Sequence, residues 1–151
     1  MSRSEKAVFT NMCMIYDDNG RILVQDRLNS NWPGITFPGG HVEREESFAQ
    51  SVIREVYEET GLTITSPVLC GVKQFQTNDD ERYIVLLYKT NQFEGELKSS
   101  EEGRVFWIER ADLYHYKLAN DFDKMLEVFE SDTLSEFYYE QDGNQWQVKL
   151  L

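Results

Sequence analysis

Residues 35–62 read ITFPGGHVEREESFAQSVIREVYEETGL, which combines a short apolar run, a glycine pair and a helical pattern. Phe48, Val52 and Val56 recur every four residues, so they share one face of an amphipathic helix. Gly61 follows the last of these turns, and glycine readily takes the left-handed conformation that ends a helix. The stretch therefore predicts a glycine loop that leads into a helix closed by a glycine.

Acidic side chains crowd one edge of this predicted helix. At about 100° per residue, Glu55 and Glu59 project almost together, and Glu58 lies about 80° to one side. Acids near the C-terminal end oppose the helix dipole, and like charges four residues apart repel each other. A divalent cation would offset this cost, since Mg²⁺ prefers carboxylate oxygens and is commonly shared with substrate phosphates. A solvated acidic face is the alternative, and it is the ordinary explanation for the preceding acids, Glu43, Glu45 and Glu46.

The same stretch resembles the Nudix box, whose pattern is Gly-x5-Glu-x7-Arg-Glu-aliphatic-x-Glu-Glu-x-Gly-aliphatic. Every specified position of the pattern is filled, by Gly40, Glu46, Arg54, Glu55, Val56, Glu58, Glu59, Gly61 and Leu62. The flanking residues 31–43 and 118–120 are similar to those of MutT-like 8-oxo-dGTP diphosphatases. The resemblance implies an α/β fold, a Nudix-type α/β/α sandwich with a mixed β-sheet, in a single domain of residues 1–151.

Composition limits the possible partners. The chain has 151 residues, which suits one domain, and its net charge of −12 argues against binding to a nucleic-acid polymer. Cys13 and Cys70 lie in apolar contexts without the spacing of a zinc site or a disulfide framework. Free thiols, a polar N-terminus and the lack of a membrane-spanning run predict a cytoplasmic protein that makes no membrane contact. It is expected to be a monomer or a homodimer.

Other elements follow from local patterns along the chain. Residues 7–16 form a β-prone run, residues 17–20 are a turn signal, and residues 21–27 read as the returning strand of a hairpin. Further predicted elements are strands at 68–75, 83–88 and 105–108, a helix at 121–130, and a terminal hairpin formed by 136–140 and 145–151. The continuous apolar run at 83–88 is typical of a strand that is covered on both faces.

The resemblance also implies roles for particular residues. Metal ligands are expected at Glu55, Glu58 and Glu59, with a backbone carbonyl of Gly39 or Gly40. Arg54 is expected to orient these carboxylates, and Glu46 to support the loop. The catalytic base is Glu55 or Glu102, with Glu101 as a substitute for Glu102, and the ordinary alternative for Glu102 is a solvated loop acid. Glu102 is therefore predicted to be both a catalytic residue and a metal ligand, and the metal to be Mg²⁺, with Mn²⁺ also suitable.

Substrate contacts are predicted at the edges of this site. In MutT-like enzymes an asparagine at this place can read an oxidised purine edge, so the resemblance implies this role for Asn120, and an amide suits it because it both donates and accepts. A helix N-cap is the alternative. Arg27 and His41 are expected near the phosphates, with surface positions as alternatives, and Gly39 and Gly40 complete the predicted substrate contacts. Aromatic residues at strand positions either stack on the base or belong to the core, and these are Phe75, Tyr83 and Trp107.

These features predict a Mg²⁺-dependent nucleoside triphosphate diphosphatase that hydrolyses 8-oxo-dGTP to 8-oxo-dGMP and pyrophosphate, and so sanitises the nucleotide pool. Three alternatives stay open. The first is a Nudix enzyme that acts on a nucleotide sugar, a dinucleoside polyphosphate or capped RNA. The second is a Nudix-fold sensor that binds a nucleotide without cleaving it. The third is an acidic metal-binding protein with no nucleotide preference.

Overall fold

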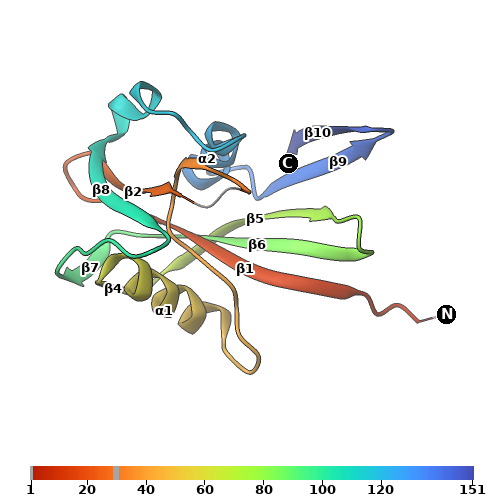
Figure 1. Ribbon diagram of the computed structural model, residues 1–151, viewed down its shortest axis with the longest axis horizontal. Coiled ribbons are helices and arrows are strands. Elements are labelled where there is room, and N and C mark those ends of the chain that lie inside the picture. Colours follow the sequence, from red (N-terminus) through yellow and green to blue (C-terminus); the bar gives the residue numbers. More distant parts are fainter. Residues whose placement is uncertain (1, 29–30) are drawn as a thin grey trace.

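The computed structural model describes residues 2–28 and 31–151 of the chain and is built around a five-stranded mixed sheet (Figure 1). The strand order is β1-β6-β5-β9-β10, with bounds of Lys6–Ile15, Glu81–Thr90, Val68–Gln76, Glu136–Asp142 and Gln145–Leu150. β1 pairs with β6 and β5 with β9 in parallel, whereas β5–β6 and β9–β10 are antiparallel. The predicted terminal hairpin and the mixed sheet are both confirmed.

Two smaller sheets complete the strands. The first has the order β3-β2-β8, with bounds of Gly34–Thr36, Arg21–Arg27 and Gly103–Glu109. The second pairs β4 (Leu62–Thr65) with β7 (Gln92–Gly95). A 3₁₀ helix, η1 (Arg110–His115), follows β8 and leads the chain toward the second α-helix. The three-stranded sheet is important for the site because its strands carry Arg27 and Gly103 at one end.

The two α-helices lie on opposite faces of the mixed sheet, α1 (Phe48–Thr60) below it and α2 (Phe122–Glu130) above it in Figure 1. β6 passes between two apolar layers. Val85 and Leu87 belong to the layer under α2, and Leu86 and Tyr88 to the layer under α1. The alternation arises because successive strand side chains point to opposite faces. The expectation of a strand covered on both faces is confirmed.

The predicted hairpin of residues 7–27 is wrong in its pairing. The chain does turn at residues 17–20, but only Tyr16 and Ile22 form a bridge between β1 and β2. β1 instead pairs with β6, and β2 pairs with β3 and β8. Residues 11–15 of β1 are buried, with alternate side chains in the two layers, and an isolated two-stranded hairpin could not cover both faces.

The C-terminal end of α1 matches the predicted glycine stop, and a serine caps the N-terminal end. The Ser47 hydroxyl caps the first turn by accepting a hydrogen bond from the Gln50 N–H at 3.0 Å. Gly61 closes the helix at φ +78°, and its N–H donates to the Tyr57 carbonyl at 2.9 Å. A Cβ at Gly61 would lie 2.4 Å from the Glu96 carbonyl oxygen, so only glycine fits there. The helix is therefore fixed in length and direction by its own sequence.

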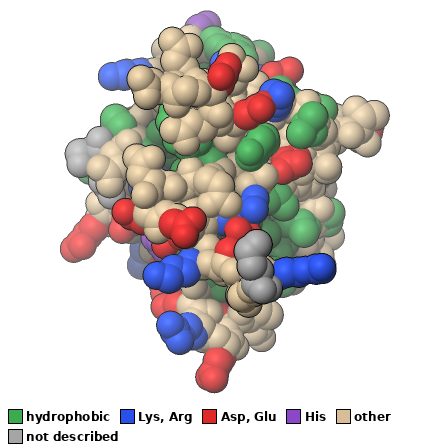
Figure 2. All heavy atoms as spheres, turned by 90° about the vertical axis from the view of Figure 1, so that its right-hand side faces the viewer, with side chains coloured by type: hydrophobic (Ala, Val, Ile, Leu, Met, Phe, Trp, Pro, Cys, Tyr) green, Lys and Arg blue, Asp and Glu red, His purple; other side chains and the backbone are tan. Residues whose placement is uncertain are grey.

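The surface shows no broad basic area on the face presented in Figure 2, where acidic, basic and apolar side chains are mixed among the described residues. Within the described ranges, the helices are all too short or too polar to cross a membrane.

Truncation of a core aromatic residue should destabilise the fold strongly. Phe129 of α2 is fully buried and packs edge-on against Phe37 at 5.1 Å between ring centroids. Phe129→Ala should lower the free energy of unfolding by about 3–5 kcal/mol, because the truncation leaves a cavity. Urea denaturation followed by circular dichroism measures this change. Tyr57→Ala is the matched control, since Tyr57 is 58% exposed, and a loss of similar size there would contradict the assignment of the core.

Candidate functional site

The loop between β3 and α1 is held along the edge of β1. The Asn11 N–H donates to the Gly40 carbonyl at 2.8 Å, and the Cys13 N–H donates to the Pro38 carbonyl at 2.9 Å. Farther along, the Val42 N–H donates to the Phe9 carbonyl at 2.9 Å. The loop therefore occupies the position of a neighbouring strand, and backbone hydrogen bonds alone hold it along β1.

The Asn11 side chain connects this loop to α1. Its Oδ1 accepts a hydrogen bond from the Gly40 N–H at 3.1 Å, and its Nδ2 donates to the Ser51 hydroxyl at 2.9 Å. Asn11 is only 4% exposed, so each of these partners satisfies a buried polar group. Asn11 was not predicted as a site residue, although a lone amide within an apolar strand is a signal that could have identified it.

Close packing against the backbone of β1 requires glycine at 39, and Gly40 lies against the end of the Glu55 side chain. A Cβ on Gly39 would lie 2.0 Å from the Asn11 carbonyl oxygen. A Cβ on Gly40 would lie 2.3 Å from the Glu55 carboxyl group. The loop backbone thus approaches β1 more closely at Gly39 than any other residue type would allow, and at Gly40 a larger residue would displace the Glu55 carboxyl group.

Arg54 is the centre of the acidic cluster. Its Nε and Nη2 donate to the two carboxylate oxygens of Glu46 at 2.6 and 3.0 Å. Its Nη1 donates to Glu55 at 2.9 Å and to Glu58 at 3.1 Å, and Nη2 also reaches the His41 carbonyl at 3.0 Å. One guanidinium therefore joins three carboxylates to the loop, which uses the fixed fork geometry of arginine.

The pKa values of the carboxyl groups in this cluster shift in opposite directions because their surroundings differ. Hydrogen bonds from Arg54, then from the Glu43 N–H, lower the pKa of Glu46 to about 2. Burial raises the pKa of Glu55, although the Arg54 hydrogen bond and charge oppose the shift. Glu46 therefore stays charged, whereas burial disfavours the charged form of Glu55.

Glu59 is the most buried acid of the site, with 6% of its surface exposed. Its Oε2 accepts a hydrogen bond from the Gly39 N–H at 2.8 Å. Burial raises its pKa to about 7, the nearby charges of Glu55 and Glu102 add to the rise, and Arg27 opposes it. Excess negative charge is therefore concentrated where the glycine loop, β2 and β8 meet.

The acids do not form a closed metal cage in this structure. Among the residues at 2–28 and 31–151, no three His, Cys, Asp or Glu side chains are arranged so that they could hold one metal ion. Glu55 and Glu58 turn toward Arg54, and Glu59 turns toward the Gly39 N–H. The donor set still suits a hard divalent cation, since burial and then the charges of Glu55 and Glu102 raise the pKa of Glu59, and a bound cation would favour its charged form.

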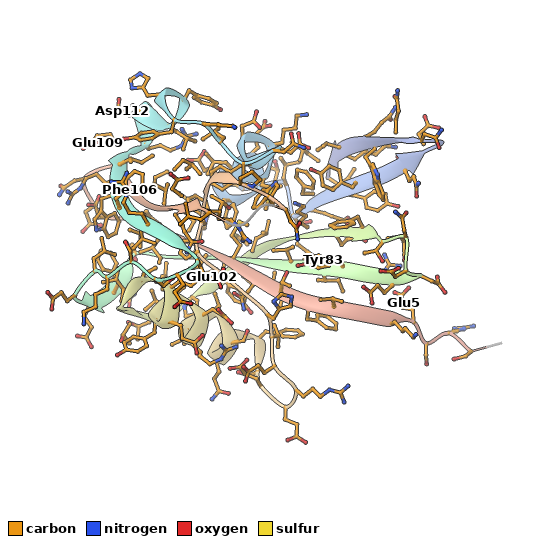
Figure 3. All side chains as sticks on the ribbon, viewed as in Figure 1. Glu5, Tyr83, Glu102, Phe106, Glu109 and Asp112 are labelled. Carbon is orange, nitrogen blue, oxygen red and sulfur yellow. The ribbon has the colours of Figure 1, made fainter. Side chains whose placement is uncertain are left out.

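Three of the other predicted site residues lie near these acids. The positive charge of Arg27 acts on Glu59, and His41 is exposed beside Glu55, whose pKa it lowers. Glu102 lies in the turn just before β8, close to the ribbon of α1, as Figure 3 shows. Its carbonyl accepts a hydrogen bond from the Leu28 N–H at 3.4 Å, which ties the loop to the end of β2.

Asn120 lies apart from this cluster, just before α2 on the other side of the sheet. Its carbonyl accepts a hydrogen bond from the Trp32 indole N–H at 2.8 Å, and the residue is exposed. The N-cap position belongs to Asp121, so the N-cap alternative for Asn120 is wrong. The aromatic residues named above pack in pairs, with Phe75 stacked on Tyr83 at 5.3 Å between ring centroids.

Comparison with known proteins gives consistent matches. A family model described as NUDIX domain matches residues 8–129. The uncharacterized Nudix hydrolase YvcI of Bacillus subtilis is 31% identical over 112 residues, covering 71% of this chain and 69% of that protein. The ADP-ribose pyrophosphatase of Methanocaldococcus jannaschii is 31% identical over 118 residues, covering 76% of this chain and 69% of that protein. The crystal structure of the mutator MutT protein from Bacillus halodurans matches with a TM-score of 0.73 and 26% identity, covering 93% of this chain and 97% of that one.

The raised pKa of Glu59 predicts a pH-dependent stability. Between pH 4.5 and about 7 the folded chain holds a proton at Glu59 that the unfolded chain has lost. Stability of the metal-free protein should therefore fall as the pH rises through this window, by up to about 3 kcal/mol relative to Glu59→Gln. Urea denaturation of both proteins in chelator, from about pH 5 to about pH 8, measures the difference. Glu45→Gln is the control, and equal pH slopes for the wild type and Glu59→Gln would contradict the prediction.

Proposed function

The chain belongs to the Nudix family, and on that basis we propose that it is a divalent-metal-dependent nucleoside triphosphate diphosphatase. It would release a nucleoside monophosphate and pyrophosphate. The observation that carries the proposal is the Arg54 cluster, in which three carboxylates and the glycine loop share one guanidinium. A complete cluster of this kind suits an enzyme better than a nucleotide sensor, because a sensor does not need a catalytic metal site.

Glu55, Glu58 and Glu59 would hold the metal, together with a backbone carbonyl of Gly39 or Gly40. Mg²⁺ suits these hard oxygen donors, and Mn²⁺ is also compatible. When bound, such an ion neutralises phosphate charge and acidifies a coordinated water. Glu58 is the most accessible of the three side chains at 55% exposure. Breaking its ion pair with Arg54 to bind the metal would therefore cost little free energy.

The other residues would position the reactants. Arg54 holds Glu55 in place, and Glu46 fixes Arg54 through two parallel hydrogen bonds. Glu102 is placed near Glu59 on a loop, where it would accept the proton of the attacking water, with Glu55 as the second candidate for this base. Arg27 and the His41 segment would contact phosphate oxygens.

The favoured substrate is an oxidised purine nucleotide such as 8-oxo-dGTP, which would make the protein a nucleotide-pool sanitation enzyme. Support comes from the similarity to the mutator MutT structure and from the exposed amide of Asn120 at the start of α2. ADP-ribose is the second candidate, because the relative from Methanocaldococcus jannaschii is named an ADP-ribose pyrophosphatase.

We further propose that residues 1–151 form one domain and that the protein acts in the cytoplasm. The C-terminal hairpin shares the core with the region that matches the family model, since Phe137 of β9 is fully buried in the layer under α2. Cys13 and Cys70 are both free thiols, which suits a reducing compartment.

Identification of the products tests the proposed function. Purified protein with Mg²⁺ should convert 8-oxo-dGTP to 8-oxo-dGMP and pyrophosphate faster than it converts dGTP, and chelator should stop the reaction. Chromatography with ADP-ribose and a dinucleoside polyphosphate in parallel separates the substrate candidates. Preferred cleavage of another compound would support a hydrolase but contradict the proposed role of Asn120 in base recognition. Tight binding without any product would reject the hydrolase.

Glu58→Gln tests the metal role. The variant should lose about 100-fold or more in kcat, because it removes one carboxylate from the proposed metal set. Its melting temperature should change little, because the Glu58 side chain is 55% exposed. Glu45→Gln is the matched control on the neighbouring loop, and steady-state rates at saturating Mg²⁺ measure both variants. Unchanged turnover in Glu58→Gln would rule out Glu58 as a ligand.

A further inference from the structure

A second charged feature adjoins the acidic cluster but has the opposite sign. A pocket of about 310 Å³ lies between the end of β2, β8 and the segment after η1. We call it the basic pocket and define it by six of its lining residues, Asp26, Arg27, Arg104, Phe106, Tyr116 and Lys117. Three cations against one acid give this lining a net charge of +2, in a chain whose total charge is −12.

The cations of the basic pocket have no carboxylate partners. Within the described part of the chain, Arg27, Arg104 and Lys117 make no ion pair, as is also true of other cations such as Lys6 and Lys98, whereas Arg21, Arg54 and Arg110 are paired. The three differ from the other unpaired cations because they line one pocket. In so acidic a chain, unpaired cations gathered around one hollow are available to an external anion.

Arg104 shows this availability most clearly. Asp26 is its cross-strand neighbour in the β2–β8 ladder, yet the two side chains form no ion pair. The Arg104 guanidinium instead lies over the Phe106 ring, 4.4 Å from its centroid, and Tyr116 packs against that ring at 5.7 Å. A guanidinium that is stacked on an aromatic face keeps its N–H edge free for an acceptor in its plane, such as a phosphate oxygen.

Arg27 connects the basic pocket to the acidic cluster. The residue lines the pocket, and its charge acts on Glu59. Its Nε is one of two buried side-chain nitrogens that lack a hydrogen-bond partner in the described residues. A ligand that is held in the pocket therefore lies beside the acids that would bind the metal.

We infer that the basic pocket binds the terminal phosphates of the nucleoside triphosphate, the part that leaves as pyrophosphate. This inference rests on the proposed function for its substrate. The pocket volume is at the lower end for small-molecule sites and suits a compact anion better than a whole nucleotide. Stacking of a base is disfavoured, because Arg104 and Tyr116 already pack on the Phe106 ring. The pocket would thereby favour triphosphates over substrates such as ADP-ribose that lack a free terminal phosphate.

Binding of inorganic pyrophosphate in chelator tests the pocket without the metal. Isothermal titration should give a dissociation constant about tenfold weaker for the double variant Arg104→Gln, Lys117→Gln, which removes two charged donors. Both side chains are exposed, so the variant should fold, and its melting temperature checks this. The double variant Lys6→Gln, Lys98→Gln is the charge-matched control, since both lysines are exposed and neither lines the pocket. Equal affinities for the wild type and the double variant, or no binding to the wild type, would overturn the inference.

Steady-state kinetics with Mg²⁺ test whether the bound phosphates belong to the substrate. The double variant should raise KM for a nucleoside triphosphate about tenfold with kcat nearly unchanged, and it should leave KM for ADP-ribose within about twofold. Equal changes for both compounds would overturn the assignment to terminal phosphates. If the wild type hydrolyses nothing, the proposed function fails, and the pyrophosphate titration still decides whether the pocket binds this anion.

Discussion

The pairing of Arg54 with Glu46 is the interaction on which the geometry of the site depends. Two hydrogen bonds of 2.6 and 3.0 Å fix the plane of the guanidinium, so its remaining N–H groups can point only toward Glu55, Glu58 and the His41 carbonyl. Arginine is required here because lysine has no planar fork. The helix and the loop are thus joined by one side chain, and the acids are kept close together despite their repulsion.

Local signals predicted most of this arrangement. The periodicity of residues 48–56 and the glycine at 61 predicted α1, and the spacing of Glu55 and Glu59 correctly predicted that their charges interact. The pairing of β1 could not be predicted in the same way. Its partner, β6, lies more than 60 residues away, and a turn signal at 17–20 reports only the local direction of the chain.

Contacts between side chains and the backbone were the second feature that could not be predicted from the sequence. Asn11 accepts a hydrogen bond from the Gly40 N–H, and Glu59 accepts one from the Gly39 N–H. The lone amide of Asn11 marks the residue in the sequence, but the partner in each contact depends on where the loop crosses β1. The glycine pair predicted a loop that leads into the helix, but not its close approach to β1. The basic pocket was missed for the same reason, since Arg27, Arg104 and Lys117 come from three separate segments.

The two charged features solve opposite parts of one problem. The proposed substrate is a polyanion, which an acidic protein would have to attract and then place beside its own carboxylates. A metal ion can neutralise the phosphates near Glu55 and Glu59, but its charge is already partly offset by those same ligands. The basic pocket supplies positive charge that needs no ion, and Arg27 carries that charge to the border of the acidic cluster. Substrate orientation would then follow from charge alone, with the metal at one end of the phosphate chain and the guanidinium groups at the other.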